Sequence, residues 1–440
     1  MKNELIPSLY NVFSKIYKKI FHEELSFEVI NFLNNISYVG FGLGFATLFS
    51  FTFNVISGRL LGPSLYGEFA LVESVAMFLY IPMLMGYHAS LVKYNAEKKS
   101  YERQRTIIST TYLLVFTLII VSIIVYDFFS IEISKLLSIS KDLFHYSVIY
   151  SVLFVIYTLS TETLKSLHEL KKYSLFKPLF SFTLLTCFLY FINIGFVSSR
   201  SMIYSMYIAY IVTSVVIIYL IRNYLKFCFD RKWISELTKY SFYAVMGGLS
   251  FVLYTNVDKL LINKYLNVMD VGVYRAYNYA FVSIIQLLII VFGTVFFPYA
   301  SMCSNKQILY KKINKMIPYI LIMGLPVSLI CGLIVLQFYG KDYILNIRLA
   351  FLFGIAGICI AIDNLYGQLI SAIGVKGIKI VSLAAIIMAL TNTFLNIVLI
   401  PLKGVEGAIL ATIVSFLFSI SIMLSKRNYI YNSEGYDVRN

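Results

Sequence analysis

The sequence predicts an all-α protein that crosses a membrane about twelve times. Of its 440 residues, 59% are hydrophobic and 13% are charged, and the mean hydropathy is +0.79. Soluble globular proteins are about half apolar and about one quarter charged. Because one span with its loop takes roughly 30–35 residues, the chain has room for about a dozen helices and for no large extramembrane domain. The composition therefore excludes a soluble enzyme and a disordered chain.

Apolar runs long enough to cross a bilayer follow one another along almost the whole chain. The predicted spans lie near residues 36–57, 69–92, 106–128, 143–164, 176–197, 202–221, 240–262, 273–297, 316–337, 347–370, 380–400 and 405–424. The polar sequence from Ser425 onward leaves no room for another span. We therefore expect twelve transmembrane helices.

The basic residues alternate between rich and poor loops. With the N-terminus inside, the cytoplasmic segments hold 27 of the 37 Lys and Arg residues and the outer segments hold 10. This asymmetry follows the positive-inside rule and predicts a multi-pass protein of the cytoplasmic (inner) membrane with both termini in the cytoplasm. The net charge of +15 therefore reports topology and indicates no nucleic-acid partner.

The predicted spans divide into two sets of six around a basic connection. We expect an amphipathic cytoplasmic segment at 1–35, an N-lobe at 36–221 (spans 1–6), a basic inter-lobe linker at 222–239, a C-lobe at 240–424 (spans 7–12) and a cytoplasmic tail at 425–440. The N-terminal segment alternates lysines with aromatic and aliphatic residues, which is typical of a helix lying on the inner leaflet.

An internal repeat supports the two lobes. An offset of 205 positions aligns Leu61, Gly67 and Phe69 with equivalent residues at the junction of spans 7 and 8, namely Leu266, Gly272 and Tyr274. Two six-helix lobes of equal orientation predict a parallel pseudo-two-fold along the membrane normal. Transporters often have this architecture, with a substrate cavity between the repeats.

Several segments resemble those of a known transporter family. Residues 58–71 read GRLLGPSLYGEFAL, which resembles the R-x-L-G-P-x-x-Y-G-x-[YF]-A-L segment of polysaccharide-repeat flippases, the O-antigen and capsule exporters of the multidrug/oligosaccharidyl-lipid/polysaccharide superfamily. The segments 257–262 with 271–274, Phe297-Pro298, 396–401 and 404–412 are also similar to that family. Span two lacks the arginine expected in lipid II flippases, which disfavours export of peptidoglycan precursors.

The resemblance implies a flippase that moves a polyprenyl-(pyro)phosphate-linked oligosaccharide from the inner to the outer leaflet by alternating access. The expected partners are this lipid-linked substrate, membrane lipids, and a polysaccharide polymerase or glycosyltransferases of the same pathway. A multidrug exporter of the same superfamily, with an acidic cavity for cationic drugs, is one alternative. A membrane polymerase or glycosyltransferase is another, although the short outer loops disfavour it.

Three basic residues are candidates for binding the phosphate of the headgroup. Lys259 and Arg275 lie near the outer ends of spans seven and eight, and Arg59 follows span one. Charges at membrane depth are costly and mark substrate or ion pathways. A purely interfacial role, with the long side chains reaching toward water, is the alternative for each of them.

Three carboxylates are candidates for ion coupling or charge pairing. Glu73 sits about one turn inside span two, Asp258 precedes Lys259, and Asp363 is the deepest acid in the chain. Each could exchange a proton or bind a cation. The structural alternatives are an Asp258–Lys259 pair and a helix-capping role for Asp363.

The sequence predicts no cofactor, no metal and no enzymatic activity. The chain has no G-x-x-x-x-G-K-[ST] loop, its four histidines are scattered, and its five cysteines form no C-x-x-C pair. We therefore expect a secondary transporter, with H⁺ or Na⁺ as the coupling ion.

Overall fold

The computed structural model describes residues 27–97, 100–226, 230–302 and 306–426. In this part of the chain the secondary structure is helical throughout, which confirms the predicted fold class. The first half contains α2 (Phe27–Leu84), α3 (Tyr87–Asn95), α4 (Tyr101–Phe128), α5 (Ser130–Leu136), α6 (Lys141–Ser166), α7 (Leu170–Asn193), α8 (Ser199–Ile221) and the 3₁₀ turn η1 (Arg222–Tyr224).

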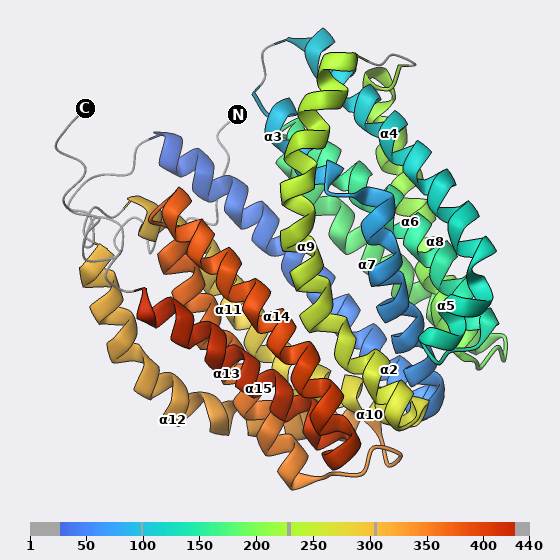
Figure 1. Ribbon diagram of the computed structural model, residues 1–440, viewed down its shortest axis with the longest axis vertical. Coiled ribbons are helices and arrows are strands. Elements are labelled where there is room, and N and C mark those ends of the chain that lie inside the picture. The colour runs from blue at the N-terminus through green and yellow to red at the C-terminus, as the bar shows by residue number, and fades with distance from the viewer. Residues whose placement is uncertain (1–26, 98–99, 227–229, 303–305, 427–440) are drawn as a thin grey trace.

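The second half begins with α9, and a short π-helical segment interrupts its second span. Its elements are α9 (Arg231–Tyr265), α10 (Val268–Tyr277), the π segment η2 (Asn278–Val282), α11 (Ser283–Met302), α12 (Lys306–Tyr339), α13 (Ile347–Ser371), α14 (Val375–Lys403) and α15 (Val405–Ser425). The helices of the two halves gather on opposite sides of the molecule, and α9 runs along their boundary (Figure 1). The N-terminal segment and the tail fall mostly outside the described residues.

Ten helices in the described ranges are long and apolar enough to cross a membrane, and they agree with twelve crossings for two reasons. The segment Gly44–Leu84 has 41 residues, which is about twice the length needed for one span, and it therefore holds predicted spans one and two. Predicted span eight is divided among α10, η2 and α11, none of which is among those ten helices.

The two spans inside α2 meet at a glycine-proline bend. Gly62 has φ 71° and ψ 172°, values that a residue with a side chain rarely adopts, and Pro63 starts the next helix. We call this end of the molecule the Gly62 end. Figure 1 shows α5 and α10 at the same end and α3 at the opposite end, the α3 end.

A reciprocal glycine contact joins the two halves at the Gly62 end. A Cβ atom on Gly67 would fall 2.0 Å from the carbonyl oxygen of Val268, and one on Gly272 would fall 1.9 Å from that of Pro63. The offset of 205 aligns Gly67 with Gly272 and Pro63 with Val268. The two contacts are therefore equivalent under the repeat. Such mutual contacts are the signature of two-fold symmetry, here between two halves of one chain. We call this contact the glycine seam.

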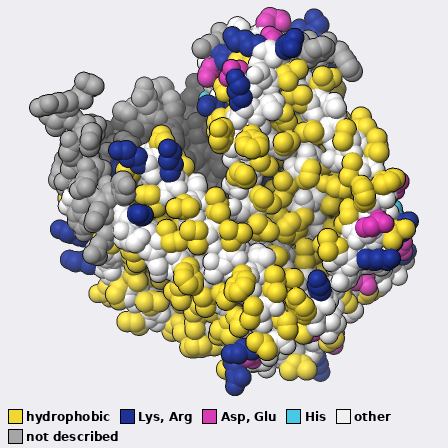
Figure 2. Space-filling model, viewed as in Figure 1, with side chains coloured by type: hydrophobic (Ala, Val, Ile, Leu, Met, Phe, Trp, Pro, Cys, Tyr) yellow, Lys and Arg dark blue, Asp and Glu magenta, His cyan; other side chains and the backbone are white. Residues whose placement is uncertain are grey.

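The side chains that face outward suit a lipid environment. Phe116, Ile120 and Ile124 follow one another at helical spacing on α4 and are all exposed. Figure 2 shows hydrophobic side chains over much of the face it presents. Exposed apolar area of this extent would aggregate in water and is stable in a bilayer.

Candidate functional site

A cavity of about 430 Å³ lies between the two halves of the chain. Its walls come from α2, α6, α7 and α8 on one side, and from α9, α10, η2, α11, α13 and α15 on the other. Four of the six site residues predicted from the sequence line it: Glu73, Asp258, Lys259 and Arg275. The fold therefore gathers into one space ionisable groups from three separate spans.

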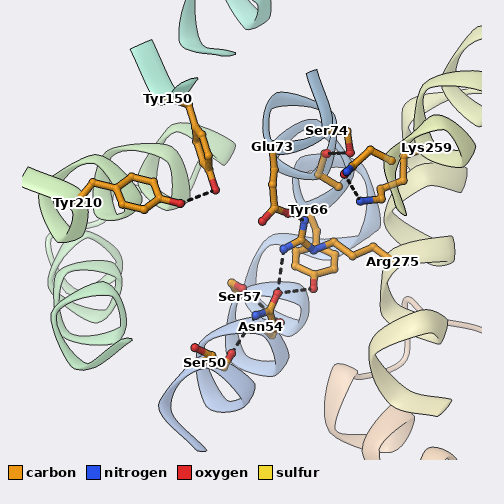
Figure 3. Close-up of polar contacts among 12 residues, drawn as sticks. Ser50, Asn54, Ser57, Tyr66, Glu73, Ser74, Tyr150, Tyr210, Lys259 and Arg275 are labelled. Carbon is orange, nitrogen blue, oxygen red and sulfur yellow. Dashed lines mark hydrogen bonds and ion pairs between the residues drawn. The ribbon is translucent and has the colours of Figure 1, made fainter. Parts of the chain in front are cut away.

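Arg275 reaches from α10 to partners that all belong to α2. Its Nη1 donates to Glu73 Oε2, and its Nη2 donates to Asn54 Oδ1 at 3.1 Å. The guanidinium also lies 5.0 Å from the ring centres of Tyr66 and Phe69. Figure 3 shows Glu73, Asn54 and Tyr66 converging on this group. Charge-assisted bonds and ring contacts together compensate for the desolvation of a buried arginine.

Asp258 is the centre of a second polar cluster, within the second half. Its Oδ2 accepts hydrogen bonds from Tyr274 Oη at 2.5 Å and Thr412 Oγ1 at 3.3 Å, and its Oδ1 accepts from Asn396 Nδ2 at 2.6 Å. Asn392 extends the cluster by accepting from Asn396 and donating to Thr412. The carboxylate is 3% exposed, so these neutral donors replace the water it has lost.

The Asp258 cluster presents oxygen atoms and one carboxylate. Asn396 Oδ1 is buried there without a hydrogen-bond partner. Within the described ranges no group of three or more His, Cys, Asp and Glu residues could hold a metal ion. An oxygen-rich cluster with a single charge suits a proton or a hard monovalent cation better than a transition metal.

Lys259 faces the cavity without an acidic partner among the described residues. Its Nζ donates to the neutral Asn256 Oδ1 at 3.1 Å, and no ion pair joins it to Asp258. The structure therefore does not contain the Asp258–Lys259 pair that the sequence offered as a structural alternative. Lys259 leaves one positive charge available to an anion that enters the cavity.

The wall contributed by the first half is largely aromatic. Tyr210 donates to the hydroxyl of Tyr150 at 3.1 Å, and its ring lies 4.9 Å from that of Phe180. Tyr150 lies on the side of Glu73 that faces away from Arg275 (Figure 3). The cavity thus has an aromatic wall and a charged wall, which suits a ligand with both polar and ring-like parts.

Local helix irregularity accompanies the charged wall. The π segment η2 starts three residues after Arg275 and brings Asn278 and Tyr279 to the cavity. Such π bulges often occur at functional sites because one extra residue turns the following side chains. No sequence pattern predicted this segment.

The other two predicted site residues lie elsewhere. Arg59 is exposed at the Gly62 end beside Gly340. Asp363 is half-buried within the second half, with its Oδ1 buried and unpartnered, and neither residue lines the cavity. Their proposed roles stay predictions.

Sequence reasoning missed the neutral residues that complete the two clusters. Asn54, Tyr66, Asn392, Asn396 and Thr412 carry no charge, so the search for ionisable groups passed over them. The available signal was the presence of asparagines in strongly apolar spans, where an amide is costly unless it is bonded.

The fold is similar to those of solved transporters. A multidrug resistance transporter of the MATE family of the MOP superfamily, in an inward-facing conformation, matches with a TM-score of 0.62 at 14% identity, over 89% of this chain and 96% of that one. The lipid II flippase MurJ in an inward closed conformation matches with a TM-score of 0.56 at 17% identity, over 88% and 89%. The chain therefore shares the fold of these solved transporters, with a cavity between two helical halves.

The sequence itself identifies the family of the chain. A family model described as "Polysaccharide biosynthesis protein" matches residues 32–304, which is more than half of the chain. The chain belongs to this polysaccharide biosynthesis family. No curated protein sequence matches it.

Proposed function

We propose that the protein translocates a polyprenyl-(pyro)phosphate-linked oligosaccharide from the inner to the outer leaflet of the cytoplasmic membrane by alternating access. The observation that carries this proposal is the cavity between the halves, where Lys259 and Arg275 face one space opposite aromatic side chains. A phosphate requires cations, and sugar rings stack on aromatic faces. Membership of the polysaccharide biosynthesis family supports the same substrate class.

In this proposal the two halves are rigid lobes, at 36–221 and 240–424, that rock against each other, and the glycine seam is a contact that closes the Gly62 end. The Gly62 end faces the outside, and the α3 end and both termini face the cytoplasm. The cavity volume of about 430 Å³ is that of a typical small-molecule site, so the lobes must part further to admit an oligosaccharide. Enzymes that build and polymerise the glycan would supply and consume the substrate.

Two sources of energy are available to such a transporter. Outward movement of one negative charge across an inside-negative membrane is favourable by about 2.3 kcal/mol per 100 mV. The Asp258 cluster adds a site for a coupling H⁺ or Na⁺, because its carboxylate can be neutralised by either. The charge of Glu73 is already balanced by Arg275 in this conformation, so Glu73 is the second choice as coupling group.

A multidrug cation antiporter is the second candidate, favoured by the similarity of the fold to MATE structures. A cationic drug would need an acidic cavity, but Glu73 is occupied by Arg275 and Asp258 by neutral donors. Among the described residues, the cavity therefore offers an anion a lysine without an ion-pair partner and offers a cation no carboxylate that lacks partners.

The test is headgroup translocation in proteoliposomes that contain the purified full-length protein. A fluorescent polyprenyl-pyrophosphate-linked oligosaccharide should become accessible to a reductant on the opposite side of the membrane, while a cationic dye should not be transported. Glu162→Gln is a matched control, because Glu162 pairs with Lys165 at 2.8 Å away from the cavity. Transport of the dye without translocation of the lipid would overturn the proposal in favour of the antiporter.

A further inference from the structure

The Glu73–Arg275 contact raises the question of what Arg275 binds during transport. Arg275 belongs to the second half, and its hydrogen-bond partners Glu73 and Asn54 belong to the first half. Its side chain is 11% exposed and that of Glu73 is 26% exposed. The carboxylate is therefore the more accessible member of the pair, and it lies where an anion entering the cavity would meet Arg275.

We propose that Glu73 is a built-in competitor for the anionic group of the substrate, holding Arg275 in the empty protein until a phosphate-bearing headgroup takes its place. This inference rests on the proposed function, because it assumes that the transported lipid carries a phosphate. A carboxylate and a phosphate present similar oxygen pairs to a guanidinium fork, so the exchange preserves the geometry at Arg275.

The charges of the cavity favour this exchange. Asp258 is saturated by neutral donors, Glu73 is paired, and Lys259 has only the neutral Asn256 as a hydrogen-bond partner. A phosphate that enters beside Lys259 brings at least one negative charge next to Glu73. Repulsion between the two anions then weakens the ion pair, and the more highly charged group is favoured at Arg275.

The displaced carboxylate has a second partner within reach. The hydroxyl of Tyr150 accepts a hydrogen bond from Tyr210 at 3.1 Å, which leaves the hydrogen of Tyr150 free to donate. That hydroxyl points toward Glu73 (Figure 3). Glu73 can thus exchange an arginine of the second half for a tyrosine of its own half without becoming an unpaired buried charge.

The exchange links substrate binding to movement of the lobes. The Glu73–Arg275 pair crosses the interface on which the glycine seam also lies, so its loss removes one of the contacts that hold the Gly62 end closed. A neutral lipid cannot displace Glu73. Selection for an anion and opening toward the outside would therefore depend on the same residue.

Binding of a sugar-free polyprenyl pyrophosphate to the full-length protein in nanodiscs tests the competition. Glu73→Gln should lower the Kd for this lipid about tenfold, because the competing charge is removed while the side chain keeps its size. Glu73→Asp keeps the charge but shortens the side chain by one methylene, and it should give an intermediate Kd. Glu162→Gln should leave the Kd unchanged.

A distance measurement tests the link to opening. Spin labels on Lys135→Cys and Lys341→Cys, which are exposed residues at the Gly62 end of the two halves, report their separation. The wild-type distance should lengthen only when the pyrophosphate lipid is bound, whereas Glu73→Gln should show the longer distance without lipid. If Glu73→Gln accumulates poorly, the distance without lipid is compared between Glu73→Asp and the wild type, and a longer distance in Glu73→Asp supports the inference.

Equal Kd values and equal distances in wild type and Glu73 variants would overturn the inference and leave Glu73 as a fixed structural partner. This outcome would not affect the proposed function if the wild type still translocates the lipid-linked oligosaccharide. Conversely, the Glu73 variants could change the Kd for the pyrophosphate lipid as expected while the wild type translocates no lipid-linked oligosaccharide. This result would refute the proposed substrate and support the competition between Glu73 and the pyrophosphate for Arg275.

Discussion

The two halves of the chain place chemically opposite groups at equivalent positions. In the first half Phe53 packs edge to face against Phe69, with ring centres 6.2 Å apart. The offset of 205 aligns these residues with Asp258 and Tyr274, which share a hydrogen bond of 2.5 Å. The same backbone repeat therefore supports an aromatic contact in one half and a polar cluster in the other.

This difference indicates that the first half mainly provides a rigid structure and the second half mainly binds ions. Aromatic packing gives the first half a rigid wall, because interlocked rings have few alternative arrangements. A buried carboxylate is expensive to maintain, and a chain that keeps one in the second half must gain something other than stability. We infer that ion and anion chemistry is concentrated in the second half, with Glu73 as the contribution of the first half.

The largest effect is expected when the carboxylate of Asp258 is copied into the equivalent position of the first half, Phe53. Phe53→Asp places an unpaired carboxylate among Phe69 and Phe188 and should cost at least about 3 kcal/mol of folding free energy. The protein should then fail to accumulate in the membrane, as measured by size-exclusion chromatography of a fluorescent fusion. Normal accumulation of this variant would show that the first half tolerates the polar pattern and would remove the contrast.

Arg275→Ala should have the next largest effect, on transport. Loss of a charge-assisted contact of this kind corresponds to roughly ten- to hundredfold in rate, while the amount of protein in the membrane stays near normal. Arg275→Lys should retain part of the activity, because a point charge still attracts phosphate although the fork is lost. Lys172→Ala is the control, since Lys172 is half-exposed and pairs with Glu169 at 3.3 Å outside the cavity. Normal transport by Arg275→Ala would make the residue a merely structural one.

The glycine seam offers a test of symmetry between the halves. Gly67→Ala and Gly272→Ala each place a Cβ atom against a carbonyl oxygen of the opposite half, and over-packing of this kind costs about 1–3 kcal/mol. The closed state should lose population by roughly tenfold in both variants, seen as faster labelling of a cysteine at the Gly62 end. Gly44→Ala and Gly247→Ala are controls, because a Cβ there meets no atom within 4 Å. Strongly unequal effects of the two seam substitutions would contradict the pseudo-two-fold contact.

The smallest effect is expected at Asp363, which lies in the second half but outside the cavity. Asp363→Asn imitates the protonated acid. It should leave the maximal translocation rate within about twofold of wild type, because Asp363 does not line the cavity and a substitution outside the site has a small effect. Any dependence of the rate on an imposed pH gradient should be lost if this residue carries the coupling proton. Unchanged gradient dependence would remove Asp363 from the mechanism and leave Asp258 as the coupling group.

The sequence was sufficient to predict the spans, and physical reasons explain why. Hydrophobic length is a local property, so each of the twelve apolar runs could be read without knowledge of its neighbours. The repeat at Gly67 and Gly272 was also visible in the sequence, whereas the bend at Gly62-Pro63 was not predicted. The backbone approach that makes those glycines necessary became apparent only when the two junctions were seen in contact.

The partners within the site could not be predicted in the same way. Arg275 and Glu73 are 202 positions apart, and nothing in either segment identifies the other as its partner. The hydrogen-bond partners of Asp258 come from α10, α14 and α15, and they are neutral side chains whose importance depends on burial. Arg59 illustrates the converse, because a basic residue beside a span has the same sequence pattern whether it faces a cavity or water.

The central claim is that the polar cluster of the second half drives transport while its aromatic counterpart in the first half only supports the fold. The most direct test compares Asp258→Asn with Phe53→Leu by the rate of lipid-linked oligosaccharide translocation per folded molecule in proteoliposomes. Asp258→Asn should lower this rate about tenfold or more, because the charge is lost and the shape is kept, whereas Phe53→Leu should stay within about twofold. Similar rates for the two variants, or a larger loss in Phe53→Leu, would contradict the account.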